Sequence, residues 1–294
     1  MSEQIQQKYP VFILCGEDPH RRRLMEEIDP ERKYKSKALL PFLGKRLIDW
    51  QVEELTQSPW VDELYVLGLS EADLPFNFPV HYVPVETASD VSRKLLAGLA
   101  YLKKEGKDDG LVVVSSCDAP GIKVNEINQF FEILNENPTS DFVLSLVPEA
   151  VAEAVFPKSG RVVARFEDCQ VLPGELFAVT PRAIRKKKHL IADIGNRRRK
   201  INRQADTISL GPMLKLVARQ PKTWLTIIKY LRGKATLADA ERSLSAAFGI
   251  KVKGAIIPEA GFGMDMDLPE DYERLKEYVQ KTKLGGDSRI IAEV

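Results

Sequence analysis

The chain has 294 residues, of which 44% are hydrophobic, so it can build a sizeable core and is not expected to be disordered. Lys and Arg number 43 against 42 Asp and Glu, so the overall charge gives no field that would attract nucleic acid or anionic lipid. Any partner recognised by charge is therefore expected at a local cluster.

The cysteines and the apolar runs indicate a cytoplasmic protein. Cys15, Cys117 and Cys169 are odd in number, distant in sequence and match no metal-ligand spacing, so we interpret them as core or near-core thiols in a reducing compartment. The first ten residues are polar, and no apolar run approaches the roughly 18 residues of a membrane span. We expect neither a membrane span nor a nucleic-acid partner.

The first half of the chain alternates short β-rich runs with amphipathic helical patterns. The predicted strands are 11–15, 64–67, 80–83 and 111–115, and the predicted helices are 45–56, 91–104 and 124–134. The fourth strand is continuously apolar, which is typical of a central strand in a parallel sheet. This βαβ order predicts a three-layer α/β/α sandwich.

The second half of the chain changes pattern. Strands are predicted near 142–147, 161–166 and 175–179, without a full helix between the first two, which indicates a mixed sheet. Residues from about 181 to 249 are mostly helical, and a strand at 252–257 and a helix at 269–279 return to the sheet. We therefore predict a single domain over 1–294 that carries a helical insertion at about 181–249.

The loop after the first strand is the first candidate for a binding site. It runs from Leu14 to Arg23 and leads to Lys37. Doubly wound folds place ligands at the carboxyl end of the first parallel strand, and an ammonium fixed near a polyphosphate stabilises the charge of a departing pyrophosphate. Gly16 alone is weak evidence for a phosphate loop, and on spacing alone the plainer interpretation of Lys37 is a solvated lysine in a basic stretch.

Asp118 is the second candidate because it follows the apolar strand at 111–115. A carboxylate at the carboxyl end of a central strand faces the crevice and is a natural oxygen ligand for Mg²⁺. The structural alternative is an Asx turn that introduces Pro120 and Gly121.

A partner for Asp118 could come from Asp265 and Asp267, just before the last predicted helix. Alternate residues on an extended segment point the same way, so both carboxylates could face one metal ion. The alternative is that Asp267 is the N-cap of that helix, with Pro269 in its first turn and Glu270 three residues on.

Three segments together resemble motifs of the molybdenum-cofactor guanylyltransferase-like NTP transferases. The resemblance extends over nearly the whole chain and includes an uncharacterised branch of that superfamily with a helical insertion. The segments are Lys37-Ala-Leu-Leu-Pro41 with Gly44-Lys45, Cys117-Asp-Ala-Pro120, and Asp265-Met-Asp-Leu-Pro-Glu-Asp271.

This resemblance implies a GT-A-type Rossmann-like fold and a Mg²⁺-dependent nucleotidyltransferase that joins an NTP to a phosphorylated small-molecule acceptor and releases pyrophosphate. The implied catalytic residues are Lys37, Asp118 and Asp267, and the implied metal ligands are Asp118, Asp267 and Asp265. The implied nucleotide-binding residues are Leu14, Cys15, Gly16, Glu17, Arg23, Lys37, Ser89 and Asp118. Gly174 and Glu175 stand where the family has a turn that shapes the acceptor pocket.

Two other functions are compatible with these residues. Glu17 replaces a glycine of the family's first motif and adds a side chain where a polyphosphate should lie, which favours a non-catalytic nucleotide or sugar-nucleotide binding protein. Asp265 and Asp267 also form an Asp-x-Asp pair that could hold the metal of a GT-A-type glycosyltransferase.

The insertion carries ten basic residues between Arg182 and Arg203. Such a tract could bind an acidic acceptor, a phosphorylated lipid headgroup or nucleic acid, although a solvated helical face is the plainer interpretation. The apolar stretch Trp224–Leu231 is interpreted as core packing, with a lid or the surface of a homodimer as alternatives.

Overall fold

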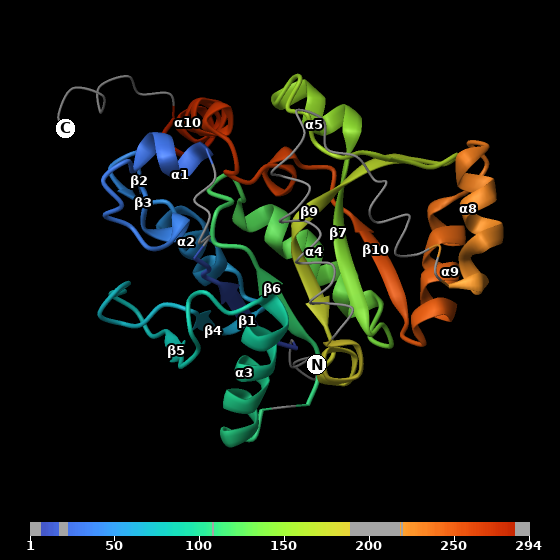
Figure 1. Cartoon of the computed structure of the whole chain (residues 1–294), viewed down its shortest axis with the longest axis horizontal. Helices are drawn as coiled ribbons and strands as arrows, with labels where there is room; N and C mark the ends of the chain where they lie inside the picture. The colour runs from blue at the N-terminus through green and yellow to red at the C-terminus, as the bar shows by residue number, and fades with distance from the viewer. Residues whose placement is uncertain (1–6, 18–22, 108, 189–217, 219, 286–294) are drawn as a thin grey trace, which may run out of the picture.

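The computed structural model describes residues 7–17, 23–107, 109–188, 218 and 220–285. One eight-stranded sheet runs through the molecule in the order β10-β7-β9-β6-β1-β4-β5, with β8 paired to β9 (Figure 1). Its strands are β1 (Tyr9–Leu14), β4 (Val61–Leu67), β5 (His81–Val83), β6 (Val112–Ser115), β7 (Phe142–Pro148), β8 (Ala164–Arg165), β9 (Gln170–Val179) and β10 (Val252–Ile256). A separate short hairpin pairs β2 (Pro41–Phe42) with β3 (Lys45–Arg46).

The sheet is mixed and mostly parallel, as the sequence predicts. β5, β4, β1 and β6 are parallel neighbours, and β10 is parallel to β7. β9 is antiparallel to both β6 and β7 and joins the two parallel halves. β6 therefore lies centrally, between β1 and β9, and the loop that carries Asp118 leaves its carboxyl end.

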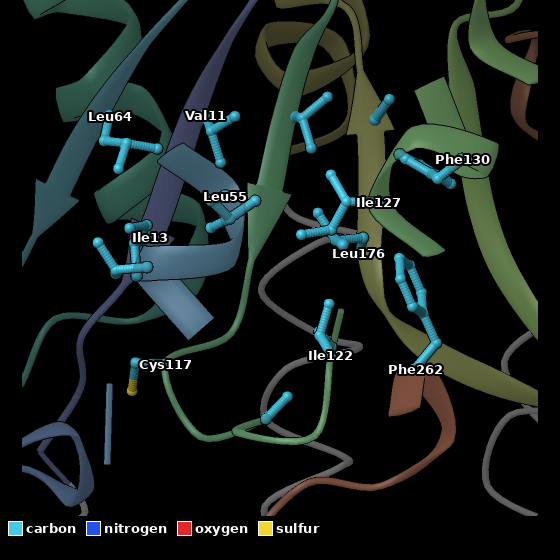
Figure 2. Packing of buried hydrophobic residues seen from close by; sticks show 14 of the residues in the cluster. Val11, Ile13, Leu55, Leu64, Cys117, Ile122, Ile127, Phe130, Leu176 and Phe262 are labelled. Atoms are coloured by element: carbon cyan, nitrogen blue, oxygen red, sulfur yellow. The ribbon is translucent and has the colours of Figure 1, made fainter. Parts of the chain in front are cut away.

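Helices cover both faces of the sheet and form the predicted three layers (Figure 1). Alternate residues of β1 divide between the two cores: Val11 and Ile13 pack with α2 (Asp49–Gln57) and α4 (Val124–Glu136), and Phe12 packs with α3 (Val91–Lys104) and the helical residues 181–188. Figure 2 shows Leu55 and Ile127 in the first of these cores. The main helices are α1 (Arg23–Ile28), α2 (Asp49–Gln57), α3 (Val91–Lys104), α4 (Val124–Glu136), α5 (Glu149–Val155), α8 (Trp224–Leu231), α9 (Leu237–Phe248) and α10 (Pro269–Lys283).

Two predicted elements differ from the structure. The helix predicted from 45 begins only at Asp49, because Lys45 and Arg46 pair as β3 after a turn in which Leu43 and Gly44 have positive φ. The strand predicted at 161–166 is reduced to the two residues of β8. At the first place, pairing between β2 and β3 overrides the local pattern that predicts a helix. At the second, the pairing with β9 that the structure describes is limited to Ala164 and Arg165.

The described part of the predicted insertion holds α8 and α9 between β9 and β10. α9 agrees with the helical character predicted for this stretch, with Thr236 as its N-cap and Gly249 in the left-handed conformation at its end. The core-packing interpretation of Trp224–Leu231 is wrong, because no residue of α8 is buried. Five of the ten basic residues of the tract lie in the described helical residues 181–188, and the other five lie outside the described residues. No helix among those described is long and apolar enough to cross a membrane.

Glu126 of α4 is an acidic residue within the core. Its side chain has no exposed surface, and the nearest ammonium, that of Lys123, is 3.7 Å away. Burial raises the pKa of Glu126 to about 7, although the charge of Lys123 opposes this rise. A carboxyl that binds a proton more tightly in the folded chain than in the unfolded chain destabilises the fold as it ionises.

Replacing Glu126 by Gln is therefore expected to change the pH dependence of stability. In the parent protein this group lowers the free energy of unfolding as pH rises from about 4.5 to about 7. The variant lacks this loss, so at pH 8 it should be more stable than the parent by about 2–3 kcal/mol, with little difference at pH 4. Urea unfolding across this range measures the effect. Glu132→Gln, at an exposed position of the same helix, is the control and should show no such pH-dependent gain.

Candidate active site

Asp118 lies at the end of β6 in a loop that a buried glutamine holds in place. Gln51 of α2 donates to the Ser116 carbonyl oxygen at 2.9 Å and to Ser115 Oγ, and its own side-chain oxygen accepts from the Ala119 N–H at 3.3 Å. Sequence reasoning missed Gln51. The available signal was a polar residue on the apolar face of the helix, four positions before Leu55.

The segment before α10 is joined to this loop through the backbone, since the Met266 N–H donates to the Asp118 carbonyl oxygen at 2.9 Å. Asp271 accepts from the N–H groups of Leu268, at 2.9 Å, and Asp267, at 3.3 Å, so it caps the start of the helix. The interpretation of Asp267 as the N-cap is thus wrong, because Leu268 occupies that position. The Asp267 carboxylate is directed elsewhere.

Lys37 brings the three predicted motifs together. It begins the single-turn helix η1 (Lys37–Leu39), in which Ser36 is the N-cap. Its Nζ makes an ion pair with the carboxylate of Asp118, lies 2.7 Å from Asp267 Oδ1, and donates to the Met266 carbonyl oxygen at 2.9 Å. All three side chains are at most one-fifth exposed. One ammonium thus joins carboxylates from two motifs that are about 150 residues apart in sequence.

Arg161 is a second cation at this site, and sequence reasoning missed it. Its guanidinium makes an ion pair with Asp265 and lies 3.3 Å from Asp271 Oδ2. Burial alone would lower the pKa of Arg161, but the charges of Asp265 and Asp271 outweigh burial and raise it. Burial, together with the nearby charges of Asp267 and Asp118, raises the pKa of Asp265 despite its arginine partner. The site therefore concentrates negative charge in a poorly solvated place.

Glu175 reaches this site because β9 is irregular there. Between the pairs Leu144–Phe177 and Leu146–Pro173, three residues of β9 face the single residue Ser145 of β7. Such a bulge redirects side chains and is common beside active sites. Gly174 permits the close contact, since a Cβ there would lie 2.5 Å from Ser145 Oγ. The segment predicted as an acceptor-side turn is thus a bulged strand.

The acidic group formed here differs in one member from the predicted metal ligands. One carboxylate oxygen from each of Asp118, Glu175 and Asp265 lies within 4.8 Å of the other two, and Asp267 is turned to Lys37. Mg²⁺ prefers oxygen ligands at roughly 2.0–2.1 Å, so oxygens on opposite sides of the ion are roughly 4 Å apart. The donor type and the spacing of this group therefore fit a divalent cation.

The first loop is held by a buried lysine that sequence reasoning also missed. Lys94 of α3 is 2% exposed, and its Nζ donates to the carbonyl oxygens of Cys15, at 2.8 Å, and Thr87, at 2.7 Å. The Glu17 N–H donates to the same Thr87 oxygen at 3.2 Å. These bonds fix the backbone from Leu14 to Glu17 beside the loop that carries Ser89.

The cysteines and Arg23 complete the predicted residues. Cys15 and Cys117 are buried and Cys169 is half-buried, which agrees with core or near-core thiols. A side-chain hydrogen bond with Cys117 and burial raise the pKa of Cys15. Arg23 is mostly exposed and pairs with Glu270 at 3.0 Å, so it lies at the start of α10 rather than on the first loop. The neighbouring Arg21 and Arg22 lie outside the described residues.

A mixed α/β sheet with a lysine and several carboxylates converging at the end of a central strand fits an enzyme that acts on a nucleotide or another phosphorylated ligand. Residues 12–198 match the MobA-like NTP transferase domain. The match covers more than half of the chain, so the protein belongs to the MobA-like NTP transferase family, and the resemblance seen in its motifs is confirmed.

Solved structures show the same fold. A hypothetical transferase from Thermus thermophilus is 22% identical with a TM-score of 0.66, and the alignment covers 90% of this chain and 100% of that one. A nucleotidyl transferase from Methanothermobacter is 14% identical with a TM-score of 0.52, covering 94% and 99%. CMP:2-keto-3-deoxy-manno-octonic acid synthetase in complex with CTP is 11% identical with a TM-score of 0.51, also covering 94% and 99%. No curated protein matches the chain.

Proposed function

We propose that the protein transfers a nucleoside monophosphate from an NTP to a phosphorylated small-molecule acceptor. An oxygen of the acceptor phosphate attacks the α-phosphorus, the bond from this phosphorus to the bridging oxygen of the β-phosphate breaks, and pyrophosphate leaves. The convergence of Lys37, Asp118 and Asp267 at the end of β6 carries this proposal. The similarity to a synthetase solved with CTP supports an NTP as the donor.

Asp118, Glu175 and Asp265 would hold Mg²⁺, for which their oxygens fit in type and spacing. Bound there, the ion would neutralise charge on the phosphate oxygens and help to align the displacement. The charge of Arg161 opposes the burial that raises the pKa of Asp265, and its contacts with the carboxylate and the carbonyl oxygen of Asp265 fix the orientation of that residue. This arrangement explains why the site needs no histidine and no nucleophilic side chain.

Lys37 contributes a positive charge that can pair with phosphate oxygens as charge builds on the leaving pyrophosphate. Asp267 Oδ1 and the Met266 carbonyl oxygen each lie within 3 Å of the Lys37 Nζ. These contacts fix the ammonium beside the acidic group. Gly174 and Glu175 lie on the β9 side of the same site, where we place the acceptor phosphate. The first loop, from Leu14 to Glu17, would support the nucleotide.

The first test is calorimetric binding of ATP, CTP, GTP and UTP with and without Mg²⁺, followed by pyrophosphate release with a panel of phosphorylated acceptors. Transferase activity predicts Mg²⁺-dependent binding of a preferred NTP, and pyrophosphate release that requires one class of acceptor. Tight NTP binding without release across the whole panel would favour a non-catalytic binding protein. Turnover of a UDP- or GDP-sugar, without turnover of any NTP, would favour a glycosyltransferase.

Two isosteric variants distinguish a residue that binds the metal ion from a residue that only pairs with Lys37. Glu175→Gln should raise the Mg²⁺ concentration needed for half-maximal activity by about tenfold or more, because it removes a direct ligand. Asp267→Asn should leave that concentration nearly unchanged and weaken NTP binding, because it releases Lys37. Mg²⁺ titrations of pyrophosphate release measure both effects. The reverse pattern would make Asp267 the ligand, as the sequence predicted, and remove Glu175 from the metal site.

A further inference from the structure

The outer face of α8 is apolar and exposed. The side chains of four large residues are open to solvent by about half or more: Trp224 is 56% exposed, Leu225 69%, Ile228 47% and Leu231 71%. The last three follow Trp224 by one, four and seven positions, which places all four side chains on one side of the helix. Exposed apolar clusters of this kind mark a surface that binds a membrane or another protein.

α8 is firmly attached through its other side. The Tyr230 ring packs on Phe166 with 5.6 Å between centroids, and its hydroxyl accepts from the Arg165 N–H at 3.1 Å. The indole N–H of Trp224 donates to the Ala218 carbonyl oxygen at 2.8 Å, so the polar atom of that ring is satisfied. The exposed face is thus a fixed feature of the fold, on an outer helix at the end of the molecule opposite α1 and β5 (Figure 1).

The charged residues of the segment that carries this face have one sign. Residues 220–238 include Lys222, Lys229, Arg232 and Lys234 and no Asp or Glu, whereas the whole chain has a net charge of only +1. Lys222, Arg232 and Lys234 are exposed, and Lys229 pairs with Asp239 at 3.1 Å. An apolar stripe with a tryptophan, flanked by lysine and arginine, is the pattern of helices that lie in the interface of an anionic membrane.

We propose that α8 and its flanking lysine and arginine residues form a peripheral docking surface for an anionic phospholipid bilayer. Trp224, Leu225, Ile228 and Leu231 would enter the boundary between headgroups and acyl chains, and the basic residues would contact lipid phosphates. With eight residues, α8 can lie in the bilayer surface and cannot cross it. A protein partner fits less well, because lysine is depleted in protein interfaces, and nucleic acid would leave the aliphatic stripe in water.

Co-sedimentation of the full-length protein with vesicles tests this surface. The protein should sediment with vesicles of phosphatidylcholine and phosphatidylglycerol in equal parts and much less with phosphatidylcholine alone. Leu225→Glu combined with Leu231→Glu should abolish sedimentation, because it places two carboxylates on the inserting face. Arg232→Gln with Lys234→Gln should weaken binding about tenfold or more, and added salt should weaken binding of the parent protein.

Matched control variants distinguish binding through the α8 surface from non-specific binding to vesicles. Lys103→Gln with Lys104→Gln removes two exposed charges from the end of α3, and Val155→Glu alters an apolar residue that is 41% exposed on α5. Neither should change sedimentation. If the parent protein sediments with neither vesicle, the proposal is wrong. A dimer in solution that Leu225→Glu with Leu231→Glu dissociates would likewise overturn it and assign this face to a second copy of the chain.

Discussion

Replacing Asp118 by Asn is expected to lower the rate of pyrophosphate release by about a thousandfold or more while the protein stays folded. Asp118 is the one carboxylate shared by the lysine contact and by the acidic group with Glu175 and Asp265. An amide of the same shape keeps the steric fit but removes the negative charge on which both interactions depend. Asp265 is already paired with Arg161, so it is poorly placed to take over the contact with Lys37.

The fold of this variant should be preserved, because the loop does not depend on the Asp118 carboxylate. Gln51 holds the loop through the Ser116 carbonyl oxygen and the Ala119 N–H, and Met266 donates to the backbone oxygen of residue 118. Initial rates of pyrophosphate release, with a thermal unfolding curve for each protein, measure the two effects separately. Asp109→Asn, at an exposed position, should match the parent in both. A folded Asp118→Asn protein with near-parental turnover contradicts the role assigned to this residue.

Much of the fold could be predicted from local pattern because burial and periodicity agree there. α3 spans the predicted residues, since its apolar positions recur at helical spacing and Asp90 accepts from the Arg93 N–H as an N-cap. β6 is buried at every position and apolar at its first three, because both of its faces are covered. The start of α2 could not be predicted in the same way, because pairing of Lys45 and Arg46 with an earlier strand overrides their helical propensity.

The residues of the site also fall into those that a local sequence pattern predicts and those that only the folded chain reveals. Lys37, Asp118 and the Asp265–Asp271 segment carry motif signals, and the structure brings them together. Arg161 gives no such signal, because its role arises only when the loop before β8 folds against the start of α10. Glu175 depends on a bulge in β9, which no local pattern near that residue shows.

The sequence signature before α10 was correct in kind and wrong in detail. An acidic residue does satisfy the N–H groups at the start of the helix, but it is Asp271 in the first turn rather than Asp267 before it. Both residues are acidic and lie close to the start of the helix, but Lys37, more than 200 residues away, pairs with Asp267, and Arg161 pairs with Asp271. Competition of this kind is a tertiary effect.

Replacing Arg161 by Leu is expected to destabilise the fold by about 3–5 kcal/mol, because it removes the cation that pairs with the buried carboxylates of Asp265 and Asp271 and leaves Asp271 with the more distant Arg274 at 3.6 Å. The side chains of Asp265 and Asp271 are 8% and 2% exposed, and burial already raises the pKa of each. Without Arg161, both groups should bind protons more readily in the folded state. The loss of stability should therefore shrink as pH falls toward 4 and the carboxyls become neutral.

Urea unfolding at pH 7.5 and pH 5 measures this change against a matched arginine. Arg165→Leu breaks the pair with Glu149, but that arginine is 61% exposed, so the cost should stay below about 1 kcal/mol at both pH values. Adding Asp265→Asn to Arg161→Leu should recover part of the lost stability, since it removes one of the unpaired charges. Equal and small losses for the two arginine variants would show that solvent reaches Asp265 and Asp271, and that Arg161 does not organise the acidic group through a buried pair.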